Sequence, residues 1–154
     1  MAATPPVSAL LYRSSAAGEV TDGIVLDILT TSLRYNARVG VTGLLLYGSA
    51  AVAPLPAERG LGSGRYAQWL EGPEAAVRDL YYARIEQDTR HDGCEVVAEG
   101  PSEALLGRGV RLFPRWSMAL ERSPALPETL PAFLAYYRRY VAANRLPDAL
   151  RPTA

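Results

Sequence analysis

The segment 39–47, VGVTGLLLY, decides how this 154-residue chain is expected to fold. It is apolar, partly β-branched and bounded by glycine, which is the pattern of a buried strand. The preceding segment, 22–36, predicts a helix, because Thr21 and Asp22 offer N-cap chemistry and apolar residues then recur at helical spacing. These apolar residues are Ile24, Ile28, Leu29 and Leu33. A helix followed by a buried strand indicates a mixed α and β protein.

Outward from this pair, the same patterns predict the remaining elements. Strands are expected over 8–12, 65–71, 94–98 and 116–120, a second helix over 73–88, and an amphipathic helix over 127–145. Segment 48–64, rich in glycine and proline, predicts a long loop, and 102–111 is expected to be irregular. The order βαββαββ followed by a C-terminal helix predicts an α+β fold, a ferredoxin-like sandwich with two helices on one face of a sheet.

Charge and cysteine content exclude several classes of function. Sixteen basic and sixteen acidic residues leave a formal net charge of +0, which gives no electrostatic basis for a nucleic acid or a membrane as the main partner. His91 and Cys94 are the only residues of their types, so no metal site is predicted. The single cysteine, the uncharged segment 1–7 and the lack of an apolar run near ~20 residues predict a cytoplasmic protein.

Two amide side chains stand on faces that are expected to be apolar. Asn36 lies three residues after an apolar position of the first helix, and Gln68 shares a strand face with Tyr66 and Leu70. A buried amide without a partner costs about 1–3 kcal/mol, so each of these residues must find hydrogen-bond partners if it is buried. Two alternatives stay open: Asn36 caps the C-terminus of its helix, or Gln68 lies on a solvated face while Trp69 points inward.

Aromatic residues on the first and last strands are further candidates. Tyr12 ends the first predicted strand, and Trp116 and Met118 share one face of the last. All three are also ordinary core residues. The glycine-rich run 60–64 leads into a strand, so it lacks the context of a phosphate-binding loop, which opens a helix. The residues alone therefore provide inward amides, a tyrosine and a tryptophan, but no catalytic set.

Five segments together resemble the BLUF family, the sensors of blue light using FAD. The resemblance covers about residues 9–120, with the expected strands and helices between the segments. It is carried by LLYRSSA (10–16), YNARVGVTGLLLY (35–47), QWLEGP (68–73), IEQDTRH (85–91) and RWSMAL (115–120). The chain departs from the family in its longer loop 48–64 and in Tyr35, which stands where the family often has a polar residue.

The resemblance implies a flavin site made by the matching residues. FAD would lie between the two helices with its ring edge toward the sheet. Asn36 would hydrogen-bond that edge, and Gln68 would bridge Tyr12 and the flavin. Tyr35 would stack near the flavin or simply pack.

The family's D-x-R-H segment also has a counterpart here. Asp88, Arg90 and His91 match it, and the resemblance places them near the flavin and its ribityl-phosphate side. Arg90 suits phosphate best of the three, because a guanidinium makes paired hydrogen bonds to phosphate oxygens.

The resemblance also implies a photocycle. Tyr12 would give an electron to the light-excited flavin and release its proton through Gln68, and the pair would then recombine. Gln68 would be left rotated or tautomerised, with a stronger hydrogen bond to the flavin and a small red shift of the spectrum. The new orientation of the amide would change the contacts of Trp116 and Met118, and through these residues on the last strand the change would reach the sheet.

The expected organisation is a photosensor domain over 1–122 followed by a C-terminal helical extension over 123–154. The resemblance implies a stand-alone sensor that catalyses no reaction and signals to a downstream protein through its C-terminal helix or sheet face. Homo-oligomers are also expected, because a net charge near zero leaves little repulsion between copies. Tyr136, Tyr137 and Tyr140 with neighbouring arginines suit an interface. The alternative is that this helix covers the open sheet face of its own domain.

Three other functions fit the sequence less well than the sensor does. A phosphatase resembling acylphosphatase needs a phosphate-cradling loop after the first strand, and 13–18 matches it only loosely. A nucleic-acid-binding protein would need a basic face. A flavin-free interaction module would not need Tyr12, Asn36 and Gln68 together.

Overall fold

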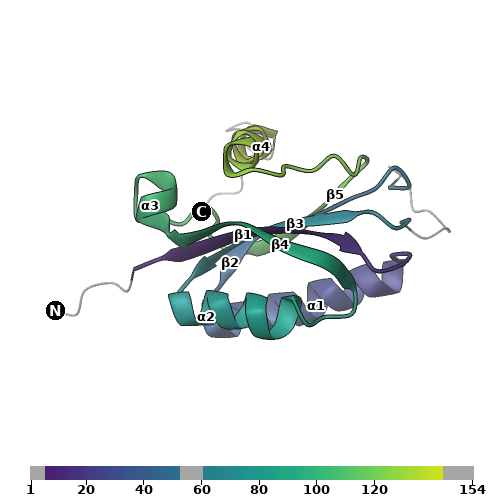
Figure 1. The fold of residues 1–154 in the computed structure, drawn as a ribbon, viewed down its shortest axis with the longest axis horizontal. Coiled ribbons are helices and arrows are strands. Elements are labelled where there is room, and N and C mark those ends of the chain that lie inside the picture. Colours follow the sequence, from purple (N-terminus) through teal and green to yellow (C-terminus); the bar gives the residue numbers. More distant parts are fainter. Residues whose placement is uncertain (1–5, 53–60, 144–154) are drawn as a thin grey trace, which may run out of the picture.

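The computed structural model describes residues 6–52 and 61–143. Its centre is a five-stranded sheet (Figure 1). The strands are β1 (Ser8–Ala16), β2 (Thr42–Gly48), β3 (Arg65–Gly72), β4 (His91–Pro101) and β5 (Trp116–Glu121). Each predicted strand is present, although β1 and β4 extend several residues beyond their predicted ends. Tyr12 consequently lies in the middle of β1 and not at its end.

The strand order is β4-β1-β3-β2-β5. The first four strands pair antiparallel, and β5 adds to the edge parallel to β2. The predicted ferredoxin-like sandwich is confirmed, with β5 as an added edge strand. Register pairs Tyr12 with Gln68 across β1 and β3, and Gly43 with Trp116 across β2 and β5. The topology thus brings three distant segments to one region of the sheet.

Helix α1 (Asp22–Val39) begins as the sequence predicts but ends later. The hydroxyl of Thr21 accepts a hydrogen bond from the Ile24 N–H, and Gly40 ends the helix with a left-handed backbone, φ 76°. Asn36 is therefore inside the helix, and its interpretation as the C-cap is wrong. Leu33 faces outward, with 45% of its surface exposed, so the apolar spacing used for the prediction does not mark one buried face.

The second predicted helix has two parts. Helix α2 (Glu74–Arg78) continues as a π-helical segment, η1 (Asp79–Ile85), and helical structure ends there, short of the predicted residue 88. A wider helical turn of this kind often occurs at a functional site. The predicted irregular segment 102–111 is also corrected, because it contains a short helix, α3 (Ser102–Leu106).

Strand β3 is buried on both faces. Gln68 contributes to the core under α1 and η1, where its neighbours on the sheet include Tyr12 and Leu45, and Trp69 points to the opposite core. Neither face is solvated, so the alternative of an exposed Gln68 is wrong. Period-two alternation cannot reveal this, because it assigns one face of a strand to water.

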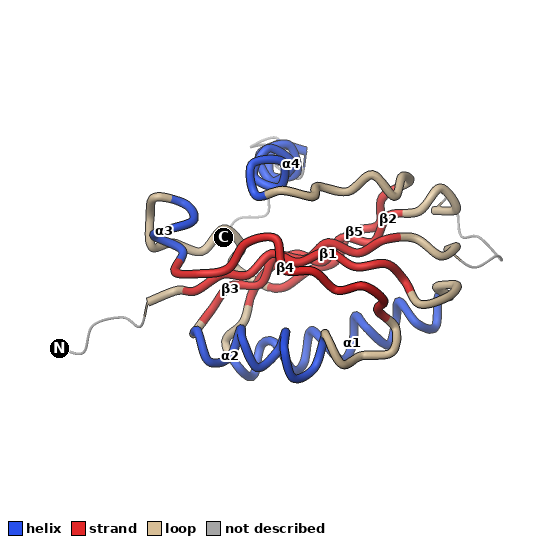
Figure 2. The backbone as a smooth tube through the Cα atoms, viewed as in Figure 1, coloured by secondary structure: helices blue, strands red, loops and turns tan. Residues whose placement is uncertain are grey.

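Helix α4 (Leu130–Ala143) covers the second face of the sheet. Figure 2 shows the resulting three layers, with α1 and α2 on one side and α4 on the other. Phe133 is fully buried and stacks on Trp69 with 5.4 Å between ring centroids. The apolar side of α4 therefore covers the sheet of its own domain, as the alternative interpretation stated.

Loop 48–64 is described only at its two ends. Tyr47 fixes the second end, since its hydroxyl lies 2.9 Å from the Leu61 carbonyl oxygen and 2.7 Å from that of Gly62. Residues 53–60 lie outside the described chain. Within 6–52 and 61–143, no helix has both the length and the apolar character needed to cross a membrane.

Candidate functional site

A buried amide joins the first, third and fifth strands. Gln68 Nε2 donates to the Tyr12 hydroxyl oxygen at 2.6 Å, and Gln68 Oε1 accepts from Trp116 Nε1 at 2.8 Å. All three side chains are less than 5% exposed. An indole nitrogen can only donate, so Trp116 fixes which end of the amide faces it. The amide therefore has one defined orientation, with its N–H toward the phenol.

Aromatic rings surround the Tyr12 phenol. The Tyr81 ring lies 5.0 Å away and the His91 ring 6.0 Å away, between centroids. Burial raises the pKa of Tyr12 well above its usual value, and the hydrogen bond from Gln68 opposes that rise. Tyr12 is consequently a neutral phenol whose only described side-chain hydrogen bond is the one to Gln68.

His91 stands behind this cluster at the start of β4. Its Nδ1 lies 2.7 Å from the Ser14 hydroxyl, and its ring contacts that of Tyr66 with 4.6 Å between centroids. Burial lowers the pKa of His91 to about 4, against an opposing effect of Asp88. The imidazole is therefore neutral at physiological pH.

A pocket of about 360 Å³ lies between α1 and η1. That volume is within the range of small-molecule sites. The residues around it come from both helices and from the turn after η1: Thr31, Ser32, Tyr35, Asn36, Leu80, Arg84, Ile85, Asp88 and Arg90. Asn36 is only 2% exposed, yet its Oδ1 has no hydrogen-bond partner among the described residues. A buried acceptor without a donor, at the wall of a pocket, is available to accept a hydrogen bond from a molecule bound there.

Side-chain bridges close the two ends of the gap between the helices. At one end Arg90 pairs with Asp88 at 2.7 Å and with Asp27 of α1 at 2.9 Å. At the other end the Tyr35 hydroxyl donates to Asp79 at 3.2 Å. The Arg90 hydrogen bonds hold the pKa of Asp88 below its usual value, although burial acts in the opposite direction. Arg90 is thus engaged by two carboxylates, which reduces its capacity to bind a phosphate.

The predicted site residues fall into two adjoining groups. Tyr12, Gln68, Trp116 and His91 lie in the core beside the sheet, whereas Asn36, Tyr35, Asp88 and Arg90 line the pocket. Met118 is partly buried on the same core as Trp116, but the hydrogen bond to Gln68 comes from Trp116.

Sequence reasoning missed several residues around the pocket. Arg84 and Leu80 precede Asp88 by four and eight positions, and Ser32 precedes Asn36 by four. Within one helix, residues at this spacing share a face. Extending the helical face of Asn36 along α1 would have identified Ser32. Asp88 lies beyond η1, which ends at Ile85, so Leu80 and Arg84 do not share a helix face with it. Tyr81 gives no comparable pattern, because its contact with Tyr12 depends on the tertiary fold.

The residues present fit a flavin. The pyrimidine edge of an isoalloxazine carries an N–H and carbonyl oxygens, which match the acceptor and donor groups of an asparagine amide. Asn36 Oδ1 is the buried acceptor that lacks such a donor. The apolar part of the pocket, from Leu80 and Ile85, suits an aromatic ring system.

Comparison with known proteins agrees with this geometry. The model of the BLUF family, "Sensors of blue-light using FAD", matches residues 7–119. This chain belongs to the BLUF family. BLUF domains are flavin-binding blue-light sensors, and this chain contains the buried hydrogen bond between Gln68 and Tyr12.

Relatives carry the domain in different contexts. The photoactivated adenylate cyclase subunit beta of Euglena longa is 32% identical over 95 residues, which are 62% of this chain and 9% of that protein. The dark-state structure of the BLUF protein BlrB is 25% identical with a TM-score of 0.61, covering 90% of this chain and 98% of its own. A bacterial light-regulated adenylyl cyclase shares the fold at 24% identity and a TM-score of 0.56, over 89% of this chain and 35% of that one. The present chain spans about 9% of the length of the curated relative.

Proposed function

We propose that this BLUF domain binds FAD between α1 and η1 and converts blue light into a changed hydrogen-bond pattern around Gln68. Asn36 would hold the flavin ring edge, and Tyr35, Asp88, Arg90 and His91 would border the site. A bound flavin supplies the absorption of blue light and the oxidising power that follows it. The observation that carries the proposal is the buried amide of Gln68 between Tyr12 and Trp116.

Tyr12 is placed to act as the electron and proton donor. Its neutral phenol is buried and in direct hydrogen bond with Gln68. A phenol that loses an electron to a light-excited flavin becomes a strong acid. In the orientation that the structure shows, Gln68 turns its N–H toward the phenol, so the amide would accept the proton through Oε1 only once it has rotated. When electron and proton return, Gln68 can settle in a rotated or tautomerised form, because an amide presents an acceptor at one end and a donor at the other.

Trp116 makes the two orientations of Gln68 unequal. After rotation the amide Nε2 would face the indole N–H, which places two donors against each other. The indole would lose its acceptor at a cost of about 1–3 kcal/mol, unless Trp116 moves. A small change of one amide would thereby reach β5, where Met118 follows Trp116 on the same face.

We further infer that the domain signals by contact and performs no catalysis of its own. A downstream protein or a second copy of the chain would read the change at α4 or at the edge strand β5. Homo-oligomer formation and a cytoplasmic location remain predictions from the balanced charge and the single cysteine.

The test is the absorption spectrum in darkness and after blue light. We expect a flavin spectrum that shifts slightly to the red and recovers in the dark. Replacing Gln68 with leucine should abolish the shift and keep the flavin, because Asn36 and the pocket are untouched. Gln87→Leu is the matched control, since Gln87 is exposed beyond η1 and this variant should shift like the wild type.

Two outcomes would contradict the proposal. A protein that stays colourless after addition of FAD would favour the flavin-free interaction module, which the pocket and the unpartnered Asn36 oxygen argue against. A normal light shift in the Gln68→Leu variant would remove Gln68 from the mechanism.

A further inference from the structure

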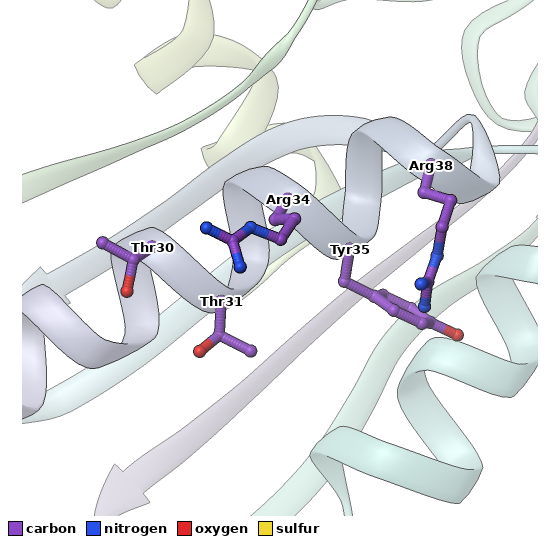
Figure 3. Close-up of a pocket in the computed structure, with 5 residues that line it drawn as sticks. All are labelled: Thr30, Thr31, Arg34, Tyr35 and Arg38. Atoms are coloured by element: carbon purple, nitrogen blue, oxygen red, sulfur yellow. The ribbon is translucent and has the colours of Figure 1, made fainter.

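A second hollow adjoins the flavin pocket on the outer side of α1. It has a volume of about 290 Å³ and is bordered by Thr30, Thr31, Arg34, Tyr35 and Arg38. Figure 3 shows these side chains along one stripe of the helix, with the Arg38 guanidinium at the Tyr35 ring and the Arg34 guanidinium on the side of Thr30 and Thr31. Thr31 and Tyr35 also line the pocket that holds Asn36. The two hollows are therefore neighbours, separated by side chains that both share.

The arginines of this hollow lack acidic partners. Within residues 6–52 and 61–143, neither Arg34 nor Arg38 has a carboxylate at ion-pair distance, whereas Arg84 and Arg90 on the facing side are paired with Asp79, Asp27 and Asp88. Arg34 and Arg38 are four residues apart, and like charges at this spacing repel each other. An unpaired arginine pair beside a pocket is the arrangement that an anion would stabilise.

The Tyr35 ring makes cation–π contacts with two arginines, Arg38 and Arg84. The guanidinium carbon of Arg38 lies 5.3 Å from its centroid, and that of Arg84 lies 4.0 Å away. These contacts hold the two guanidinium groups at the boundary between the hollows. Arg90, by contrast, is already occupied by its two carboxylates. The positive charge that no described carboxylate neutralises therefore lies on α1, outside the flavin ring pocket.

We propose that Arg34 and Arg38 bind the diphosphate of FAD, so that this domain selects a flavin dinucleotide over riboflavin. The inference rests on the proposed flavin site and adds a recognition element for the part of the cofactor beyond the ring. Four helical residues advance about 6 Å along the axis, so each arginine can engage one of two linked phosphates. The exposed Thr31 hydroxyl adds a hydrogen-bond donor between the two hollows.

The test is the affinity of flavin-free protein for riboflavin, FMN and FAD, measured by fluorescence quenching. Wild type should bind FAD about tenfold more tightly than riboflavin, with FMN between them, as expected for charge-assisted contacts at an exposed site. The double variant Arg34→Gln/Arg38→Gln should bind all three flavins with the affinity that the wild type has for riboflavin. Glutamine keeps the helix propensity of these exposed positions, so the fold should be retained.

A double variant elsewhere on the surface is the matched control. Arg108→Gln/Arg122→Gln removes the same charge from two exposed arginines that lie outside both hollows, and it should keep the preference for FAD. In wild type, added salt should weaken binding of FAD and leave riboflavin unaffected, because only the former uses ionic contacts. Inorganic pyrophosphate should compete with FAD and not with riboflavin.

The outcomes separate this proposal from the sensor function itself. Equal affinity of wild type for riboflavin and FAD would overturn the diphosphate site while the flavin site stands. The diphosphate site would also be overturned if pyrophosphate bound the flavin-free protein but FAD had no advantage, since the arginines would then serve another phosphate. Failure to bind any of the three flavins would instead overturn the proposed function.

Discussion

At the scale of single residues, the two buried amides of this domain are in opposite states. Gln68 satisfies a phenol and an indole, whereas Asn36 Oδ1 has no donor among the described residues. An amide whose oxygen and nitrogen are both hydrogen-bonded can change state only by exchanging partners, and an amide whose oxygen lacks a donor can gain free energy by binding one. Switching and cofactor retention are thus carried by different amides, on a strand and a helix.

His91 provides a residue-scale prediction that concerns pH. Its pKa is about 4 in the folded protein, against an ordinary value of 6.5, and burial is the main cause. Between these values the unfolded chain binds a proton that the folded protein resists, so the stabilisation is complete above pH 6.5 and is lost as the pH falls toward 4. The free energy of unfolding should decrease by up to about 3 kcal/mol over this range. Urea denaturation at several pH values measures it.

The control for this effect is His91→Gln, which removes the only imidazole. The difference between the two proteins is the informative quantity, because Glu71 has a raised pKa and acts on stability in the opposite direction. Parallel stability curves for wild type and His91→Gln between pH 7 and 4 would show that His91 is protonated as easily when folded as when unfolded.

Sequence reasoning singled out Tyr12, Asn36 and Gln68 from residue type and position, which are local properties. It left a structural alternative open for each, and only the family resemblance assigned them to a flavin site. It could not choose Trp116 over Met118 as the partner of Gln68, since both share one strand face and only the indole N–H reaches the amide. Nor could it show that Arg90 is held by Asp27, which is 63 residues away.

At the scale of elements, one buried carboxylate ties β3 to the segment that leads into β5. Glu71 has no exposed surface and accepts hydrogen bonds from the backbone N–H groups of Leu112 and Phe113, at 2.8 and 2.6 Å, and from Trp69 Nε1 at 3.0 Å. Gln68 and Glu71 lie on the same strand, and the anchored segment leads to Trp116. Glu71 thereby sets the position from which Trp116 approaches Gln68.

Glu71→Gln tests this element-scale role. An amide has only one acceptor oxygen, and its NH₂ would face donors, so the substitution should cost about 1–3 kcal/mol of stability. Hydrogen exchange should show faster exchange of the Leu112 and Phe113 amides. The matched control is Glu86→Gln, which changes an exposed glutamate and should leave both quantities unchanged. Unaltered protection of the two amides in Glu71→Gln would show that another contact holds this segment.

The elements themselves differ in how far sequence predicts them. The second and third strands were predicted over 39–47 and 65–71, the first from its apolar run and the second from its alternation. The first of these begins only at Thr42, because α1 continues to Val39. The end of α1 was placed early because Asn36 suits a cap, while the left-handed Gly40 actually ends the helix. The short α3 and the π-helical η1 carry no distinctive local pattern. The conformation of segment 107–115 could not be predicted from its own sequence, because it depends on hydrogen bonds to Glu71, about 40 positions away.

At the scale of the whole molecule, the sheet separates two hydrophobic cores of different composition. One core, under α1 and η1, contains the polar Tyr12–Gln68–Trp116 set, and the other, under α4, is built from stacked aromatic rings. Adjacent residues of β3 face opposite ways, so Gln68 and Trp69 are the point where the cores meet. The family match ends at residue 119, whereas α4 still contributes the buried Phe133 to the second core.

This separation predicts that stability and photochemistry can be altered independently. Phe133→Ala removes a fully buried ring from between Trp69 and Phe113 and should lower the free energy of unfolding by about 3–5 kcal/mol. Leu26→Ala, at a residue that is 60% exposed, should change it by less than about 0.5 kcal/mol. Under conditions where Phe133→Ala remains folded, its flavin spectrum and light-induced shift should match the wild type, because every side chain bonded to Gln68 lies on the other face. A shift that changed in size would mean that the Trp69–Phe133 stack transmits strain through β3, which would make α4 part of the light response.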